Sequence, residues 1–291
     1  MLPSGLTLPG HVLVVGVDGV RFDFLGPDGA PSVWALGQAG FLAQVPVDEA
    51  TPTWSGPCWA TIATGTGVAG HGITGNDLTG HRLAEHPDFV TRATRAGLPT
   101  LLAVSGWPPL ALAEDGGPLF AEASSREFTA VPRTGLAWDA ARETSQEDGL
   151  AAWDAADEDI TARAAAILAG QAPRVSFVYL GAVDFAGHAA GSGATYRAAL
   201  LAADQRVGRL VATVRARPSG PAGLPAWPRG SPASPSPSTT ATKGCSGRRA
   251  GPPNPGATPT TCSTLPSRPG WARPRRRTPS SRRPGRRRAD D

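Results

Sequence analysis

An aspartate and a histidine stand four residues apart in YLGAVDFAGHAAG, residues 179–191, a stretch that follows an apolar run. Carboxylate and imidazole groups bind zinc, and Asp184 and His188 are close enough in sequence to share an ion through a helical turn or a loop. An Asp after a strand is nevertheless more often a helix cap or a turn former. The pair indicates a metal centre only if other parts of the chain supply further ligands.

Two more candidates, Asp18 and Ser55, stand next to predicted elements. Asp18 closes the β-branched run 11–19, which is typical of a strand buried on both faces. Ser55 precedes a helix predicted for 57–65, which opens with Pro and closes with Gly. The positive end of a helix stabilises an alkoxide and attracts phosphate, although Ser at this place is also the commonest cap. Because ligands bind beyond the carboxyl ends of parallel strands, Asp18 and Asp184 are expected at one rim.

Strands and helices alternate along the chain up to residue 217, which predicts that residues 1–217 form an incomplete α/β domain with a mostly parallel central sheet flanked by helices. Residues 66–153 are rich in Gly and Pro, and most of this region is assigned to loops and insertions. The remaining predicted strands are 41–47, 100–106 and 174–184, and the remaining predicted helices are 31–40, 157–170 and a long amphipathic segment after 184.

The ordered motifs resemble the type I phosphodiesterase/nucleotide pyrophosphatase family of the alkaline phosphatase superfamily. VDGVRFDFL (17–25) resembles the opening motif of that family, SGPCWATIATGTGVAGHGITGND (55–77) its nucleophile helix, and VDFAGHAAG (183–191) its second metal motif. The resemblance implies an alkaline phosphatase-like fold. It also implies a hydrolase of phosphoric esters, either a phosphodiesterase/nucleotide pyrophosphatase or a phosphatase, with a small phosphoester or nucleotide as substrate.

The resemblance further implies two divalent metal ions, with zinc the expected metal. Asp18 and the nucleophile would bind one ion, and Asp184 with His188 would bind the other. Counting back without gaps from a Thr-Gly pair places Ser55 at the nucleophile position, with Thr53 as the alternative. Four other polar residues are interpreted as structural: Arg21 as an ion pair, His71 as a loop residue, and Asn76 and Asp77 as turn formers. Cys58 stands where the family often has Asn.

The composition changes near Pro218. Residues 1–217 contain 14 Arg against 22 Asp and Glu, a net charge of −8, whereas 218–291 contain 14 basic residues against 2 Asp, a net charge of +12. The second segment holds 16 of the 30 prolines and no Val, Ile, Phe, Met or Tyr. It cannot bury enough apolar surface to offset the entropy of ordering, which predicts a disordered tail.

The family pattern requires an Asp-His-Gly motif and a later His, but none of the five histidines lies beyond His188. A frameshift would explain this absence. In STTATK (238–243), a shifted reading frame combines the last base of each codon with the first two bases of the next codon. With suitable synonymous codons this frame reads Asp-His-Gly-His-Lys. In the same frame SPASPSPS (231–238) can read as a strand of alternating Val and Thr, and NPGATPTTC (254–262) can supply the later His. We therefore expect a frameshifted tail, three missing ligands and impaired activity.

A second class of function also fits the composition: a non-catalytic α/β protein whose basic tail binds nucleic acid. A sulfatase- or phosphopentomutase-like relative is a third possibility, although Ser55 has no Cys-x-Pro-x-Arg motif around it. Three scattered cysteines exclude a disulfide framework. No apolar run reaches the roughly 20 residues of a membrane helix, and no signal peptide is expected, so the predicted location is the cytoplasm.

Overall fold

The computed structural model describes residues 10–113, 116–131 and 146–217. The predicted tail, 218–291, lies outside these residues. In chain order the elements are β1 (Val12–Val17), the 3-10 helix η1 (Phe22–Phe24), α1 (Pro31–Ala39), α2 (Ser55–Thr64), α3 (Val68–His71), α4 (Phe89–Arg95), β2 (Thr100–Ser105), the 3-10 helix η2 (Pro108–Leu110), β3 (Ser125–Thr129), α5 (Gln146–Gly170), β4 (Val175–Leu180), α6 (Ala182–Ala190) and α7 (Ala194–Arg215).

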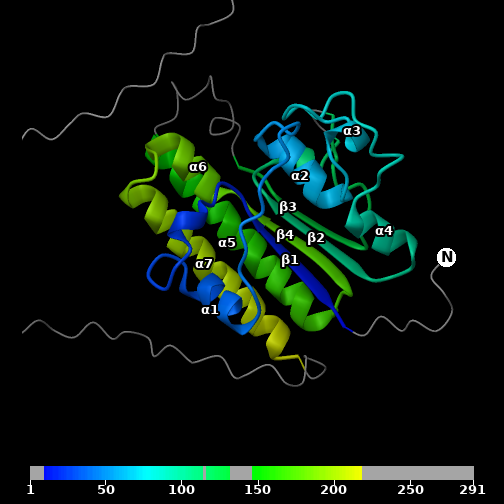
Figure 1. Ribbon diagram of the computed structural model, residues 1–291. Coiled ribbons are helices and arrows are strands. Elements are labelled where there is room, and N and C mark those ends of the chain that lie inside the picture. The colour runs from blue at the N-terminus through cyan, green and yellow to red at the C-terminus, as the bar shows by residue number, and fades with distance from the viewer. Residues whose placement is uncertain (1–9, 114–115, 132–145, 218–291) are drawn as a thin grey trace, which may run out of the picture. The chain divides into compact units, whose positions relative to one another are not determined.

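The four strands form one sheet in the order β1-β4-β2-β3, and every neighbouring pair is parallel (Figure 1). Phe177 of β4 is in register with Val14 on one side and Leu102 on the other. The connections between parallel strands pass over the sheet faces, mostly through helices, as parallel pairing requires. The predicted fold class, a parallel sheet flanked by helices, is confirmed.

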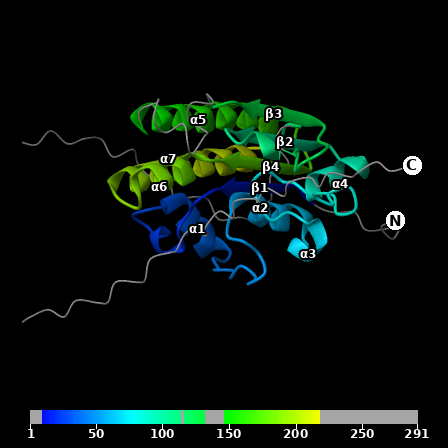
Figure 2. The same ribbon diagram turned by 90° about the horizontal axis from the view of Figure 1, so that it is seen from above.

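Helices cover both faces of the sheet, and Figure 2 shows α5 and α2 on opposite sides. On one face, Trp59 of α2 and Val90 of α4 pack in a cluster with Phe177. On the other face, Ile160 of α5 and Leu210 of α7 pack in a cluster with Val178. Because successive strand residues point to opposite faces, β4 contributes apolar side chains to both clusters. None of the helices in the described ranges is both long and apolar enough to span a membrane.

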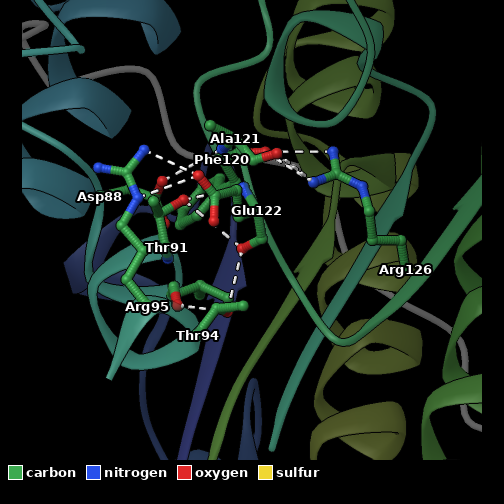
Figure 3. Close-up of polar contacts among 9 residues, drawn as sticks. Asp88, Thr91, Thr94, Arg95, Phe120, Ala121, Glu122 and Arg126 are labelled. Carbon is green, nitrogen blue, oxygen red and sulfur yellow. Dashed lines mark hydrogen bonds and ion pairs between the residues drawn. The ribbon is translucent and has the colours of Figure 1, made fainter. Parts of the chain in front are cut away.

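The region 66–153 is more structured than its composition predicts. It contains α4, the predicted strand β2 and an unpredicted strand, β3. Figure 3 shows how polar contacts bind the segment before β3 to α4. Asp88 caps α4 by accepting a hydrogen bond from Thr91 N (2.8 Å) and also accepts one from Ala121 N (3.2 Å), while Arg95 pairs with Glu122 (2.8 Å). These contacts between residues far apart along the chain give order to a Gly- and Pro-rich stretch.

One predicted strand and the start of one predicted helix are wrong. Residues 41–47, predicted as a strand, form no strand, and Phe41 and Val45 are 87% and 80% exposed. Their apolar character favours a strand, but none of the strands in the described part of the chain pairs with them. The helix predicted for 157–170 begins at Gln146, so Asp157 lies in its middle instead of its first turn.

Candidate active site

Asp18 directly follows β1, and three donors hold its carboxylate. The indole Nε1 of Trp59 in α2 and the hydroxyl of Tyr179 in β4 both donate to Oδ2, over 2.9 and 2.8 Å. The backbone N–H of Gly19 donates to Oδ1 over 2.9 Å. The predicted strand end therefore lies where β1, β4 and α2 meet, with its carboxylate fixed in position.

Asp184 lies in the first turn of α6 and adjoins Asp18 at the carboxyl end of the sheet. A Cβ atom on Gly19 would lie 2.4 Å from the Asp184 Cα, so the two chain segments touch at a position where only glycine fits. Burial, and then the negative charge of Asp18, raise the pKa of Asp184 to about 6, while His188 acts in the opposite direction. The expectation of two carboxylates at one rim agrees with this geometry.

His188 lies one helical turn after Asp184 on α6. Its Nε2 is 3.4 Å from Asp184 Oδ1, and half of the His188 side-chain surface is exposed. Residues four apart on a helix share a face, so both side chains can reach one ligand. Their role as a metal-binding pair stays a prediction.

Ser55 is the first residue of α2, and the residue before it, Trp54, has no side-chain acceptor for a cap. The carboxamide of Asn76 takes the capping role, since its Oδ1 accepts a hydrogen bond from Gly56 N over 2.8 Å. Within the described ranges the Ser55 hydroxyl has no hydrogen-bond partner, and the residue is half-buried. The Ser55 hydroxyl therefore does not cap α2. Asn76, interpreted from the sequence as a turn former, accepts the capping hydrogen bond instead.

The face of α2 that carries Ser55 is directed at Asp18. Residues three and four positions apart lie on one helix face, which groups Ser55 with Cys58 and Trp59. Trp59 bonds to Asp18, and the pKa of the Cys58 thiol is raised by burial and by the Asp18 charge. Thr53, the alternative nucleophile, is exposed ahead of the helix. Trp59 and Cys58 of α2 thus lie near Asp18, on the helix face that also carries Ser55.

Asp157 positions α6, and sequence reasoning missed it. Its buried carboxylate accepts hydrogen bonds from Gly181 N and Ala182 N, both over 3.0 Å, and from the Ser105 hydroxyl. Burial raises the pKa of this carboxyl. It acts as a cap supplied from α5, a distant helix, for the helix that carries Asp184. Only the apolar character of its neighbours in α5 could have indicated its burial.

Two residues interpreted as structural have structural contacts. Arg21 pairs with Asp23 over 2.7 Å, and its guanidinium lies 5.0 Å from the centre of the Phe24 ring. His71 is fully buried; its Nε2 lies 3.1 Å from the Thr61 hydroxyl and its Nδ1 accepts from Ile73 N over 3.0 Å. Burial lowers the pKa of His71. Neither side chain is directed to the rim by these contacts.

The donors at the rim do not complete a zinc site. Zinc in proteins has three or four protein ligands, and among the residues that the structure describes no three of His, Cys, Asp and Glu are grouped to hold an ion. Oδ2 of Asp18 already accepts two hydrogen bonds, which leaves Oδ1 as the oxygen with remaining acceptor capacity. The described residues fit part of a coordination shell only.

Residues 12–219 match the family model of the type I phosphodiesterases/nucleotide pyrophosphatases. The chain belongs to this family, as the sequence motifs indicate. No curated protein matches the chain in sequence.

Two solved structures are similar to the chain. One is an inactive variant of murine ectonucleotide pyrophosphatase/phosphodiesterase 5 in complex with AMP, with 20% identity, a TM-score of 0.48, and coverage of 71% of this chain and 52% of that one. The other is phosphonoacetate hydrolase from Sinorhizobium meliloti 1021 in complex with phosphonoacetate, with 20% identity, a TM-score of 0.48, and coverage of 70% of this chain and 54% of that one. The chain thus spans about half the length of these structures.

Proposed function

We propose that the chain is a phosphoric ester hydrolase with Ser55 as its nucleophile, and that its activity is impaired in the sequence as written. The observation that carries the proposal is the position of Ser55: the first residue of α2, with no capping role, on the helix face directed at Asp18. Family membership supplies the reaction class. Small phosphodiesters, including nucleotides, are the proposed substrates.

The residues of this chain supply two features of such a site. The amino end of α2 presents partial positive charge to an incoming phosphate and to the Ser55 oxygen. Attack by the Ser55 oxygen on phosphorus would release the alcohol of the ester and leave a phosphoseryl group, which water then hydrolyses. Family members of this type would use two divalent ions, proposed to be zinc, near Asp18, Asp184 and His188. Because these donors are incomplete here, slow or absent turnover is expected.

The experiment compares the chain as written with a frame-restored chain, in which the codons from residue 231 onward are read in the alternative frame. The frame-restored chain should bind two equivalents of zinc and hydrolyse a nitrophenyl phosphate ester, and the chain as written should do so at least about 1,000-fold more slowly. Tight binding of two zinc ions and a normal enzymatic rate by the chain as written would refute the proposed impairment.

Two matched variants of the frame-restored chain test the nucleophile. Ser55→Ala should lower kcat at least about 1,000-fold, because no other hydroxyl on this face of α2 can replace it. Thr53→Ala, two residues away and exposed, should change kcat less than about 10-fold. The opposite pattern would make Thr53 the nucleophile, and no effect of either change would remove the proposed mechanism.

A further inference from the structure

The donors that hold the Asp18 carboxylate have fixed roles. An indole N–H can only donate, and burial raises the pKa of Tyr179, so its hydroxyl stays protonated at neutral pH. Trp59 Nε1 and the Tyr179 hydroxyl both donate to Oδ2, over 2.9 and 2.8 Å. Gly19 N donates to Oδ1 over 2.9 Å. The protein itself therefore occupies most of the acceptor positions of this carboxylate.

The acceptor position that remains on Asp18 belongs to Oδ1. An ionised carboxylate has about four lone-pair positions, divided between its two oxygens. Within the described ranges, two donors share Oδ2 and one donor reaches Oδ1. Asp18 is partly exposed, so the remaining position is accessible. A ligand that needs an acceptor at Asp18 can therefore use Oδ1 but not Oδ2.

The sequence makes room for the indole that donates to Asp18. A Cβ atom on Gly16 of β1 would lie 2.4 Å from the Trp59 ring, so a larger residue there would displace the ring. The rings of Trp59 and Tyr179 meet edge to face, with their centres 5.3 Å apart. Trp59 is 7% exposed and Tyr179 is 3% exposed. Close packing therefore fixes both donors, and neither can rotate away to release Oδ2.

The polar atoms of Trp59 and Tyr179 are not needed to fill the core. Both residues belong to a cluster whose other members are apolar, such as Phe177 and Leu102. A phenylalanine in place of Tyr179 would fill the same space without a buried hydroxyl that requires a partner. Two polar groups are nevertheless placed in this cluster and directed at one oxygen of Asp18. Their arrangement indicates a role in orienting the carboxylate.

The number of open acceptor positions affects which cations a carboxylate binds well. Calcium takes about six to eight oxygen ligands and often uses both oxygens of one carboxylate. Zinc takes about four ligands, and one carboxylate oxygen supplies one of them. A carboxylate that offers a single position on one oxygen therefore suits a zinc-like ion better than calcium.

We propose that Trp59 and Tyr179 are positioning residues that restrict Asp18 to binding a cation through Oδ1, and that they thereby favour zinc-like ions over calcium. Neither residue touches the cation; both act through the carboxylate. Removal of a hydrogen-bond partner of a metal ligand typically changes metal affinity about 10- to 100-fold. The inference rests on the proposed function, since it takes Asp18 as a cation ligand, but it concerns binding and not turnover.

Cation titration of the chain as written tests the inference without a substrate. Zinc and calcium are titrated separately by calorimetry, and the ratio of the two affinities is the readout. Tyr179→Phe should lower the zinc-to-calcium ratio at least about 10-fold, because zinc loses an oriented oxygen and calcium gains access to a second one. Trp59→Phe, which keeps an aromatic ring but removes the other donor, should change the ratio in the same direction.

Tyr196→Phe is the matched control. Tyr196 is the other tyrosine of the chain and is similarly buried, but its hydroxyl donates to Gly19 O and not to a carboxylate. Its loss should change the ratio less than about 3-fold, even where it lowers stability. In an Asp18→Ala background, Tyr179→Phe should leave the ratio as it is, since the hydroxyl then has no carboxylate to orient.

The inference is overturned if the two tyrosine variants change the ratio equally, or if neither Tyr179→Phe nor Trp59→Phe changes it. It is also overturned if the effect of Tyr179→Phe persists in the Asp18→Ala background, or if the chain as written binds no zinc at millimolar concentration. A chain that shows the expected ratios, but whose frame-restored form hydrolyses no ester, would uphold this inference and refute the proposed function.

Discussion

Trp59 Nε1 donates a hydrogen bond to Asp18 Oδ2 over 2.9 Å, and this bond joins α2 to the carboxyl end of β1. Ser55 lies one turn before Trp59 on the same helix face, so the position of the proposed nucleophile relative to Asp18 depends on this contact. Tyr179 donates to the same oxygen from β4. Hydrogen bonds to the Asp18 carboxylate therefore join α2, β1 and β4 at the rim.

Tyr179→Phe removes one of these two donors with little change in volume. The loss should destabilise the fold by about 1.5–3 kcal/mol, the usual range for a hydrogen bond to a charged group. Urea unfolding measures the difference. The control is the same substitution in an Asp18→Ala background, where the loss should nearly vanish. An unchanged loss in that background would mean that the hydroxyl does not act through Asp18.

Gly19→Ala should disrupt the contact between Asp18 and Asp184. Gly19 has φ +70°, and its Cβ would lie 2.4 Å from the Asp184 Cα. Gly97 is the matched control, since it has φ +79° but open space around it. Gly97→Ala should cost about 1–2 kcal/mol for the backbone conformation alone, and Gly19→Ala at least about 2 kcal/mol more. Equal Tm shifts would contradict the close approach of these segments.

Asp157→Ala should be strongly destabilising, because it leaves the buried N–H groups of Gly181 and Ala182 without an acceptor. The expected loss is about 3–5 kcal/mol, measured by thermal or urea unfolding. Arg163→Ala is the control on the same helix: it removes exposed ion pairs with Asp159 and Glu127 and should cost no more than about 1 kcal/mol. A small loss for Asp157→Ala would mean that α6 does not depend on this cap.

Asp184 should make stability depend on pH in the metal-free protein. Its pKa is raised from 3.8 to about 6, so the folded state holds the proton more tightly than the unfolded state. Stability should therefore fall as pH rises from about 4 to about 6 and stay lower above that range. The difference between the two pKa values corresponds to at most about 3 kcal/mol, which solvent screening of a partly exposed side chain reduces to roughly 1–2 kcal/mol.

Asp184→Asn should remove this dependence and stabilise the protein at pH 7. Urea unfolding from pH 4 to 8 with a chelator present measures the effect. Asp28→Asn, at an exposed carboxylate, is the control and should leave the pH profile as it is. A variant that loses stability at pH 7 would show that the Asp184 carboxylate is favourable in the fold, contrary to the direction of its pKa shift.

Local pattern was sufficient to predict most of the sheet. The β-branched runs that became β1, β2 and β4 were predicted as strands because burial on both faces requires continuous apolar sequence. β3 was missed, since SREFT has only one large apolar residue and its strand state depends on pairing with β2. Segment 41–47 failed in the opposite way, because apolar sequence without a neighbouring strand does not make a strand.

For the candidate site, too, some features could be predicted from the sequence and others could not. The sequence by itself determined the candidates, Asp18, Ser55, Asp184 and His188, because strand ends, a helix start and ordered motifs are local features. Only the tertiary structure decided that Asp18 and Asp184 adjoin, that Asn76 leaves the Ser55 hydroxyl free of capping, and that Asp157 caps α6. These relationships join residues far apart along the chain, and their energies come from burial and from hydrogen bonds that exist only after the sheet has assembled.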